Sequence, residues 1–132
     1  MAIRCNDANG SSADFNNAAS LRTDPITAMH WVNNYADTGR TFLSVWDGST
    51  NRAWRTSAAT GPTNMRTRLS TDGANQLSTS SSTTIANDGT WYHMAFMYDG
   101  TDNEFWLNGV LDATSVDAGG LFASTADLSI GG

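Results

Sequence analysis

The sequence predicts an all-β protein built as a sandwich of two antiparallel sheets. Ser, Thr, Asn, Asp and Gly make up about half of the 132 residues, and these residue types favour turns and strands over helices. Helix-favouring charged residues are almost absent, since all seven basic residues are Arg and Glu104 is the single Glu. Asn-Gly and Asp-Gly pairs also recur at short intervals, and they separate runs of strand length.

The spacing of these turn signals predicts nine strands within one domain that spans residues 1–132. We expect the strands near residues 2–5, 26–33, 41–46, 52–58, 65–70, 91–98, 104–108, 110–114 and 127–130. The Ser- and Thr-rich segment 75–84 has Leu77 as its one apolar residue. We expect this segment to be an exposed edge or a loop.

The segment from Trp91 to Tyr98 gives the strongest strand signal. Its alternation places Met94, Phe96 and Tyr98 on one face, and both faces are largely apolar. Such a pattern is typical of a central strand. The next segment has Asn108-Gly109 between two apolar pairs, which predicts a tight hairpin because both residues tolerate positive φ.

The sequence argues against several kinds of partner and site, namely nucleic acid, a membrane span, a signal peptide, a disulfide and a zinc site. An acidic chain with a net charge of −6 and no Lys is poorly suited to contact many phosphates, so we expect no nucleic-acid binding. No apolar run is long enough for a membrane span, and the first residues have no apolar signal-peptide region. One cysteine excludes an internal disulfide, and the two histidines lie far from it without zinc-ligand spacing.

Four segments carry a resemblance to a known family. They are WYHMAFMYDG at 91–100, FWLNG at 105–109, ADLSIGG at 126–132 and ITAMHWV at 26–32. Together they resemble the laminin-G-like branch of the concanavalin-A-like lectin and glucanase superfamily. The resemblance implies a jelly roll of two antiparallel sheets and a binding role.

The resemblance also implies a strand that this sequence lacks. In the family, the Ile-Gly strand is followed by a Gly-containing strand with an Asp-Glu pair, which returns to lie beside the first strand. Here the sequence ends at Gly132. We therefore expect a jelly roll without its usual last strand, either as a fragment or with its edge completed by another chain.

Catalysis is not expected from these residues. The superfamily's glycan hydrolases use paired carboxylates on one strand, and retaining hydrolysis needs two carboxyls about 5 Å apart. The single Glu lies beside a turn, and no expected strand carries two suitably spaced acids. His30 and His93 each lie in an apolar strand without a nucleophile motif, so we interpret both as structural.

Two kinds of side chain are candidates for ligand contact. All seven Arg lie within residues 1–68, and neighbouring strands would gather four of them on one sheet, where Arg suits a sulfate or carboxylate. Pairing of these Arg with the Asp-rich second half is the alternative. Three Trp beside Asp-Gly or Asn-Gly turns could stack on sugar rings. The candidates are Arg52, Arg55, Arg66, Arg68, Trp46, Trp54 and Trp106.

Calcium is a possible cofactor, because family relatives often hold this ion with loop oxygens. Two sets of residues supply such oxygens, although neither set is a full set of ligands and capping of turns explains both more simply. The first set is Asp7, Asn9 and Asp14, and the second set is Asp99, Asp102 and Asn103.

These observations predict a non-catalytic, lectin-like adhesion module that recognises a glycan or a protein surface through rim loops. The alternative is a structural or decoration protein of a particle, such as a phage or virus surface, that assembles through its sheet edges. The absence of a signal peptide favours either a piece of a longer extracellular protein or a component released with a particle. A homo-oligomer is possible in both cases.

Overall fold

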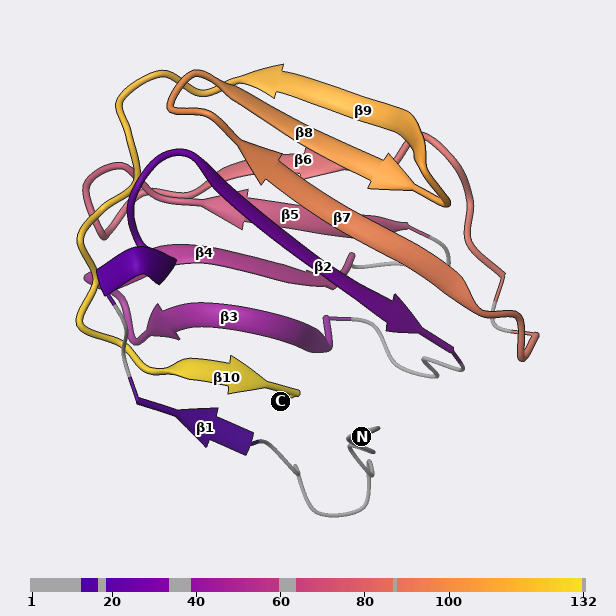
Figure 1. The fold of residues 1–132 in the computed structure, drawn as a ribbon, viewed down its shortest axis with the longest axis horizontal. Coiled ribbons are helices and arrows are strands. Elements are labelled where there is room, and N and C mark those ends of the chain that lie inside the picture. Colours follow the sequence, from indigo (N-terminus) through magenta and orange to yellow (C-terminus); the bar gives the residue numbers. More distant parts are fainter. Residues whose placement is uncertain (1–12, 17–18, 34–38, 60–63, 87, 132) are drawn as a thin grey trace.

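Two antiparallel sheets face each other in the computed structural model, which describes residues 13–16, 19–33, 39–59, 64–86 and 88–131 (Figure 1). The elements are β1 (Ala13–Phe15), the 3₁₀ turn η2 (Ala19–Leu21), β2 (Ile26–Val32), β3 (Thr41–Asp47), β4 (Asn51–Ala58), β5 (Met65–Leu69), β6 (Leu77–Ser80), β7 (Tyr92–Tyr98), β8 (Asp102–Leu107), β9 (Val110–Val116) and β10 (Leu128–Ile130). In this part of the chain, no helix is long and apolar enough to cross a membrane.

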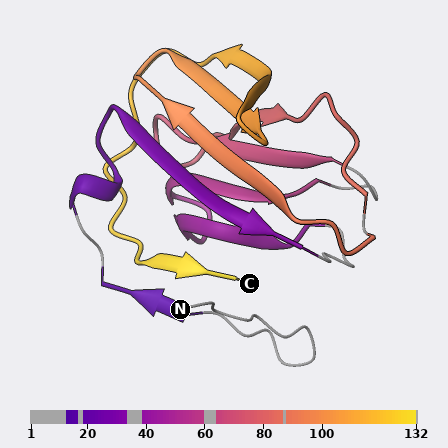
Figure 2. The ribbon, with the colours of Figure 1, turned by 45° about the vertical axis from the view of Figure 1, so that its right-hand side comes forward.

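The six-stranded sheet has the order β1-β10-β3-β4-β5-β6, and the four-stranded sheet has the order β2-β7-β8-β9. Figure 2 shows the four-stranded sheet lying across the larger one. This arrangement confirms the predicted sandwich. Strand β10 pairs with both β1 and β3, so the open edges of the described sheets are β1, β6, β2 and β9. The additional strand that the resemblance implies stays a prediction.

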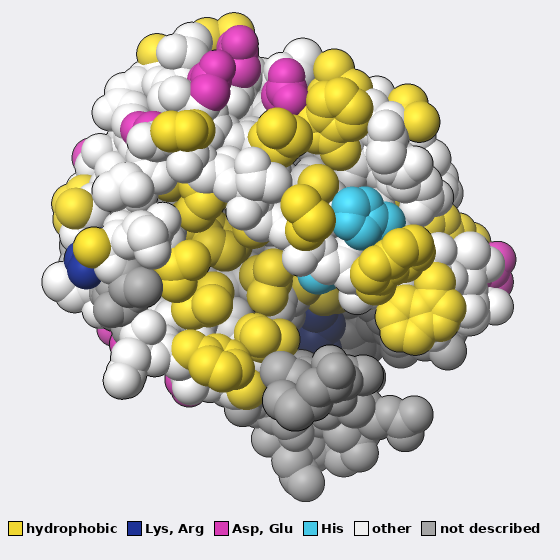
Figure 3. Space-filling model, in the orientation of Figure 1, with side chains coloured by type: hydrophobic (Ala, Val, Ile, Leu, Met, Phe, Trp, Pro, Cys, Tyr) yellow, Lys and Arg dark blue, Asp and Glu magenta, His cyan; other side chains and the backbone are white. Residues whose placement is uncertain are grey.

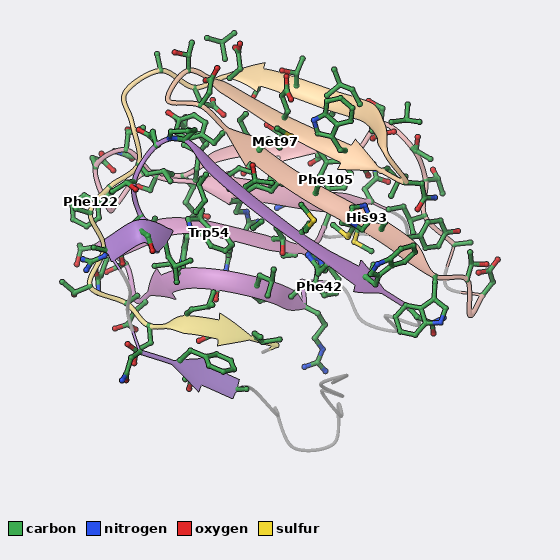
Figure 4. All side chains as sticks on the ribbon, viewed as in Figure 1. Phe42, Trp54, His93, Met97, Phe105 and Phe122 are labelled. Atoms are coloured by element: carbon green, nitrogen blue, oxygen red, sulfur yellow. The ribbon has the colours of Figure 1, made fainter. Side chains whose placement is uncertain are left out.

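The core fills the space between the sheets. Trp54 from β4 and Phe105 from β8 lie there, as Figure 4 shows. The predicted inner face of β7 is also confirmed, because Met94, Phe96 and Tyr98 are each 1% exposed. Strand β7 is central as predicted, since it pairs with β2 on one side and β8 on the other. Its outer face, however, is open to solvent.

The predicted hairpin at Asn108-Gly109 joins β8 to β9. Both turn residues have positive φ, 51° for Asn108 and 80° for Gly109, which is the combination that a type I′ turn requires. The Asn108 side chain also accepts a hydrogen bond from the backbone amide of His93, at 2.9 Å. This contact ties the hairpin to the start of β7.

Two short strands of the six-stranded sheet lie outside the nine expected strand ranges. Strand β1 was not expected at all, whereas β6 lies inside the polar segment 75–84, and its position at the edge of the sheet agrees with the expectation of an exposed edge or a loop there. Strand β1 has three residues and β6 is rich in Ser and Thr, so apolar alternation could not reveal either strand. The strand expected at residues 2–5 lies outside the described residues.

Candidate functional site

A row of polar side chains crosses the outer face of the six-stranded sheet. Strand pairing places one residue from each strand in this row, because directly opposite residues share a face of a sheet. The row consists of Asp14, Ser129, Ser44, Arg55, Arg68 and Ser78. A second row beside it contains Thr41, Ser57, Arg66 and Ser80. The face therefore combines hydroxyls with cations.

Trp46 organises the cations at one end of this face. The guanidinium carbon of Arg55 lies 4.7 Å from the centroid of the Trp46 ring, and that of Arg52 lies 5.2 Å away. Such cation–π contacts contribute about 0.5–1 kcal/mol each at exposed sites. Arg52 is further fixed by a 3.0 Å hydrogen bond from its Nε to the Gly48 carbonyl. The indole thus holds the Arg55 guanidinium at the surface of the sheet.

A pocket of about 320 Å³ lies at this end of the face, beside Trp46 and Arg55. Its lining comes from four strands and the residue after β10, namely Asp14, Thr41, Ser44, Trp46, Arg55, Ser129 and Gly131. The side chains of Asp14 and Ser129 are hydrogen-bonded to each other. The pocket therefore offers one carboxylate, one guanidinium and several hydroxyls.

The guanidinium of Arg55 has hydrogen-bonding capacity that the described residues do not use. Its Nε is buried, and no described residue accepts a hydrogen bond from it. Arg68 lies directly opposite Arg55 in the sheet, and partial burial lowers the pKa of its guanidinium from the usual value. Arginine remains charged at neutral pH in spite of such a shift. Two cations thus lie side by side on one face.

The structure brings most of the predicted ligand-contact residues together. Trp46, Arg52, Arg55, Arg66 and Arg68 come from β3, β4 and β5, which pair as their order in the chain suggests. The prediction that neighbouring strands gather these Arg on one sheet is confirmed.

Two of the predicted Trp do not belong to this cluster. Trp54 is 2% exposed, stacks on Phe96 with ring centroids 5.8 Å apart, and donates a 2.6 Å hydrogen bond from Nε1 to the Leu21 carbonyl. It is a core residue, so its prediction as a sugar platform is wrong. Trp106 lies on the outer face of the other sheet, where its Nε1 donates to Glu104 at 2.8 Å.

The second set of calcium candidates does not fit an ion site. Asp99 caps its own turn, because its Oδ1 accepts hydrogen bonds from the backbone amides of Thr101 and Asp102, each at 2.8 Å. The bond from Asp102 and the bond from Thr101 lower the pKa of Asp99. Asn103 is fully buried between the sheets and cannot join its neighbours at the surface.

In the first set, Asp14 lies in the pocket described above, whereas Asp7 and Asn9 lie outside the described residues. Across the part of the chain that the structure describes, no group of three His, Cys, Asp or Glu side chains is placed to hold a metal ion. A calcium site at the N-terminal set stays a prediction.

Asn103 belongs to a hydrogen-bonded network that links the two sheets. Its Oδ1 accepts from Thr67 Oγ1 at 3.1 Å, and its Nδ2 donates to Asp117 Oδ2 at 3.1 Å. Ser115 Oγ donates to the same carboxylate oxygen at 2.7 Å, and Tyr98 Oη donates to the Asp117 carbonyl at 2.6 Å. Buried polar groups that lose a partner are costly, so this network stabilises the sandwich.

We expect Asn103→Ala to lower the free energy of unfolding by about 2–3 kcal/mol, because it removes one partner from the buried Thr67 hydroxyl and one from the Asp117 carboxylate. Urea unfolding measures the change, with Asn75→Ala in an exposed loop as the control. A melting temperature that rises with calcium in the wild type but not in Asn103→Ala would contradict the structural role.

Sequence reasoning missed the hydroxyls that complete the pocket. Ser44 and Ser129 each lie between apolar residues in the strand segments Leu43–Val45 and Leu128–Ile130. Alternation of this kind predicts that the polar residue faces outward. It does not predict that these two serines meet Asp14, because 115 residues separate Asp14 from Ser129.

The fold and the polar face define a jelly-roll β-sandwich of the concanavalin-A-like class. The family model described as the concanavalin A-like lectin/glucanases superfamily (Laminin_G_3) matches residues 7–132, and the chain belongs to this family. The resemblance stated from the sequence motifs is therefore confirmed. A comparison with curated proteins gives no match.

Several solved structures share the fold at low sequence identity. The CBM40 module of the Ruminococcus gnavus IT-sialidase, bound to α2,3-sialyllactose, has a TM-score of 0.65 at 13% identity, over 84% of this chain and 65% of that one. Domains LG4-5 of the mouse laminin α1 chain have a TM-score of 0.65 at 12% identity, over 85% of this chain and 28% of that one. The heptameric SAP-like pentraxin of Limulus polyphemus has a TM-score of 0.63 at 13% identity, over 90% of this chain and 62% of that one. The chain thus spans less than two thirds of each of these structures.

Proposed function

We propose that this protein is a non-catalytic, lectin-like module that binds an acidic glycan on the outer face of its six-stranded sheet. The observation that carries the proposal is the pocket beside Trp46, where the Arg55 guanidinium is held in place and keeps a buried Nε without a partner among the described residues. A carboxylate or sulfate fits this group, because the planar guanidinium forms paired, charge-assisted hydrogen bonds with such anions.

The other lining residues suit the rest of a sugar. The hydroxyls of Thr41, Ser44 and Ser129 and the carboxylate of Asp14 can donate to or accept from sugar hydroxyls. Trp46 has a different role from the stacking platform that its sequence position suggests. Two guanidinium groups lie over its ring, so the indole positions Arg55 and supplies apolar surface at the pocket's side.

The pocket does not support hydrolysis of the glycan. Both classes of glycosidase require a pair of carboxyl groups around the scissile bond, and Asp14 is the one carboxylate among the residues that line the pocket. The related CBM40 module, which was solved with sialyllactose, supports the choice of a sialylated sugar as a probe. A module of this kind acts where glycans are exposed, on a cell surface or outside the cell.

We expect the wild type to bind α2,3-sialyllactose and to bind neutral lactose at least ~10-fold more weakly, since a hydrogen bond to a charged group contributes about 1.5–3 kcal/mol. Arg55→Gln should remove this preference. Arg66→Gln is the matched control, because it removes the same charge from the same sheet face without altering the pocket lining. Isothermal titration calorimetry measures all three proteins.

Two outcomes would overturn the proposal. Equal affinity of the wild type for lactose and sialyllactose would show that the anion is not recognised. An equal loss of affinity in Arg55→Gln and Arg66→Gln would show a diffuse electrostatic attraction instead of a site at the pocket, and raising the salt concentration would then abolish binding.

A further inference from the structure

Much of the outer face of the four-stranded sheet is apolar, which is unusual for a surface open to solvent. Strand pairing places Met29, Ala95, Trp106 and Leu111 in one outward row across all four strands. Trp31 lies opposite His93 beside this row. Met97 lies on its other side, in a row that also contains Thr27, Glu104 and Thr114. Trp31 is 62% exposed, Met29 is 60% exposed and Met97 is 39% exposed.

The two sheets of the molecule provide a comparison. An antiparallel sheet with one buried face normally presents polar residues on its other face. The six-stranded sheet follows this rule more closely, since its two polar rows consist of Ser, Thr, Arg and Asp, although Trp46 lies beside them. The four-stranded sheet does not follow it, although both outer faces have the same position in the sandwich. The apolar residues therefore require an explanation other than strand formation.

Aromatic rings form the most exposed part of this face. The rings of Trp31 and His93 lie with centroids 5.2 Å apart. Trp91, which is 61% exposed, lies two positions before His93, just ahead of β7, so alternation puts it on the same side. Figure 3 shows hydrophobic side chains gathered around a histidine on this side of the molecule, and Figure 4 locates His93 and Met97 on β7.

We propose that this face is the interface between two copies of the chain, which pack sheet against sheet around a two-fold axis. Sheets stack face to face at about 10 Å, with side chains interdigitating. A two-fold axis brings the same apolar rows of each copy together, so that neither copy leaves its rows exposed. The fold already uses this type of packing between its own two sheets.

The size of the face matches what a stable dimer needs. The exposed fractions of Trp31, Trp91, Met29, Leu111 and Met97 correspond to roughly 600 Å² of accessible surface, given about 150–250 Å² for a fully buried aromatic side chain. Trp106 and His93 add to this area. A standard interface buries about 800 Å² on each partner, so the face reaches the required order of size.

The chemistry of the rows favours a protein partner over a sugar. Trp and Met are enriched at the centres of protein interfaces, and charged residues are depleted there. The carboxylate within the rows, Glu104, already accepts the Trp106 indole hydrogen bond at 2.8 Å. A sugar chain would therefore find few groups to bind its hydroxyls. A second copy of the chain does not require such polar groups, because the face that it presents has the same apolar residues.

Sedimentation velocity between about 5 and 200 μM tests the proposal. The wild type should sediment as a dimer at the upper concentrations, and Met29→Thr/Trp31→Thr should be monomeric throughout, with a dissociation constant raised at least ~100-fold by loss of central contacts in both copies. Thr keeps the strand propensity of these exposed positions. The control is Val110→Thr, since Val110 is 68% exposed but pairs with Leu107, which faces the core.

A wild type that stays monomeric at 200 μM would overturn the proposal. So would a dimer that persists in the double variant, or one that Val110→Thr also dissociates. Titration with sialyllactose separates this inference from the proposed function, because the double variant should keep its affinity for the sugar. A monomeric wild type that binds a neutral oligosaccharide through Trp31 would assign the face to a glycan instead.

Discussion

Trp54→Ala is expected to lower the free energy of unfolding by about 3–5 kcal/mol, the range found when large aromatic side chains are removed from protein cores. Trp54 is 2% exposed and stacks on Phe96 across the space between the sheets. Its Nε1 also donates to the Leu21 carbonyl at 2.6 Å. The substitution removes the buried apolar surface, the stacking and the hydrogen bond, and it leaves a cavity in one of the two core clusters.

Urea unfolding of matched variants measures this effect. Trp54→Phe keeps most of the buried surface and loses the hydrogen bond, so it should cost less than Trp54→Ala. Trp31→Ala removes the same side chain from an exposed position and should change the stability of the monomer by less than about 1 kcal/mol. A similar cost for Trp31→Ala and Trp54→Ala would contradict the core assignment.

The difference between Trp46 and Trp54 could not be read from the sequence. Both residues lie in the hairpin around Asp47-Gly48, and strict alternation would put Arg52 and Trp54 on one face of β4. The pairing of β3 with β4 has an irregularity at this point, since Trp46 is opposite Arg52 and Val45 is opposite Trp54. This leaves Ala53 as an extra residue, and a bulge of this kind reverses the faces beyond it.

Elsewhere the fold follows the sequence closely, because the signals are local. Strand β7 and the Asn108-Gly109 hairpin depend on alternation and on a two-residue turn. The candidate site depends on both kinds of information. The order of β4 and β5 brings Arg55 beside Arg68, and this could be predicted. The meeting of Asp14 with Ser129 depends on a pairing between distant segments, which no local pattern specifies.

The outer face of β7 shows how one pattern can have two meanings. Apolar residues on both faces predicted a central strand, and the pairing of β7 with β2 and β8 confirms it. One face lies in the core, whereas on the other face Ala95 is 8% exposed and Met97 is 39% exposed. If the four-stranded sheets pack together as proposed, Met97 and its neighbours are buried as well, and the apolar character of this second face is explained. The dimer test thus also tests the interpretation of this strand.

Below pH 6.5 the protein is expected to lose stability through His30. Burial of its ring, together with the nearby charge of His93, lowers the pKa of His30 to about 4 from its ordinary value of 6.5. Neither ring nitrogen has a hydrogen-bond partner among the described residues, and the ring lies 5.4 Å from that of Phe42. Among the described residues, no group that surrounds the ring stabilises its charged form.

The direction of the pH effect follows from these two pKa values. Because the folded-state pKa of His30 lies below the unfolded-state value, the unfolded chain binds the additional proton between about pH 6.5 and pH 4. The contribution of neutral His30 to the free energy of unfolding is fully present above pH 6.5, and it is lost as the pH falls from 6.5 to 4. At about 1.36 kcal/mol for each pKa unit, the loss between pH 7 and pH 4.5 amounts to about 2–3 kcal/mol.

His30→Leu should remove this part of the pH dependence, and urea unfolding at pH 7 and pH 4.5 measures it. His93→Leu is the matched control, since it removes the other described histidine from the outer face and should keep most of the wild-type slope. Asp72 interferes little, because hydrogen bonds from the amides of Ala74 and Asn75 lower its pKa to about 2, and its ordinary value of 3.8 also lies below pH 4.5. Equal slopes in the wild type and His30→Leu would show that His30 is protonated in the folded protein as readily as in the unfolded chain, and the apolar environment would then not control its charge.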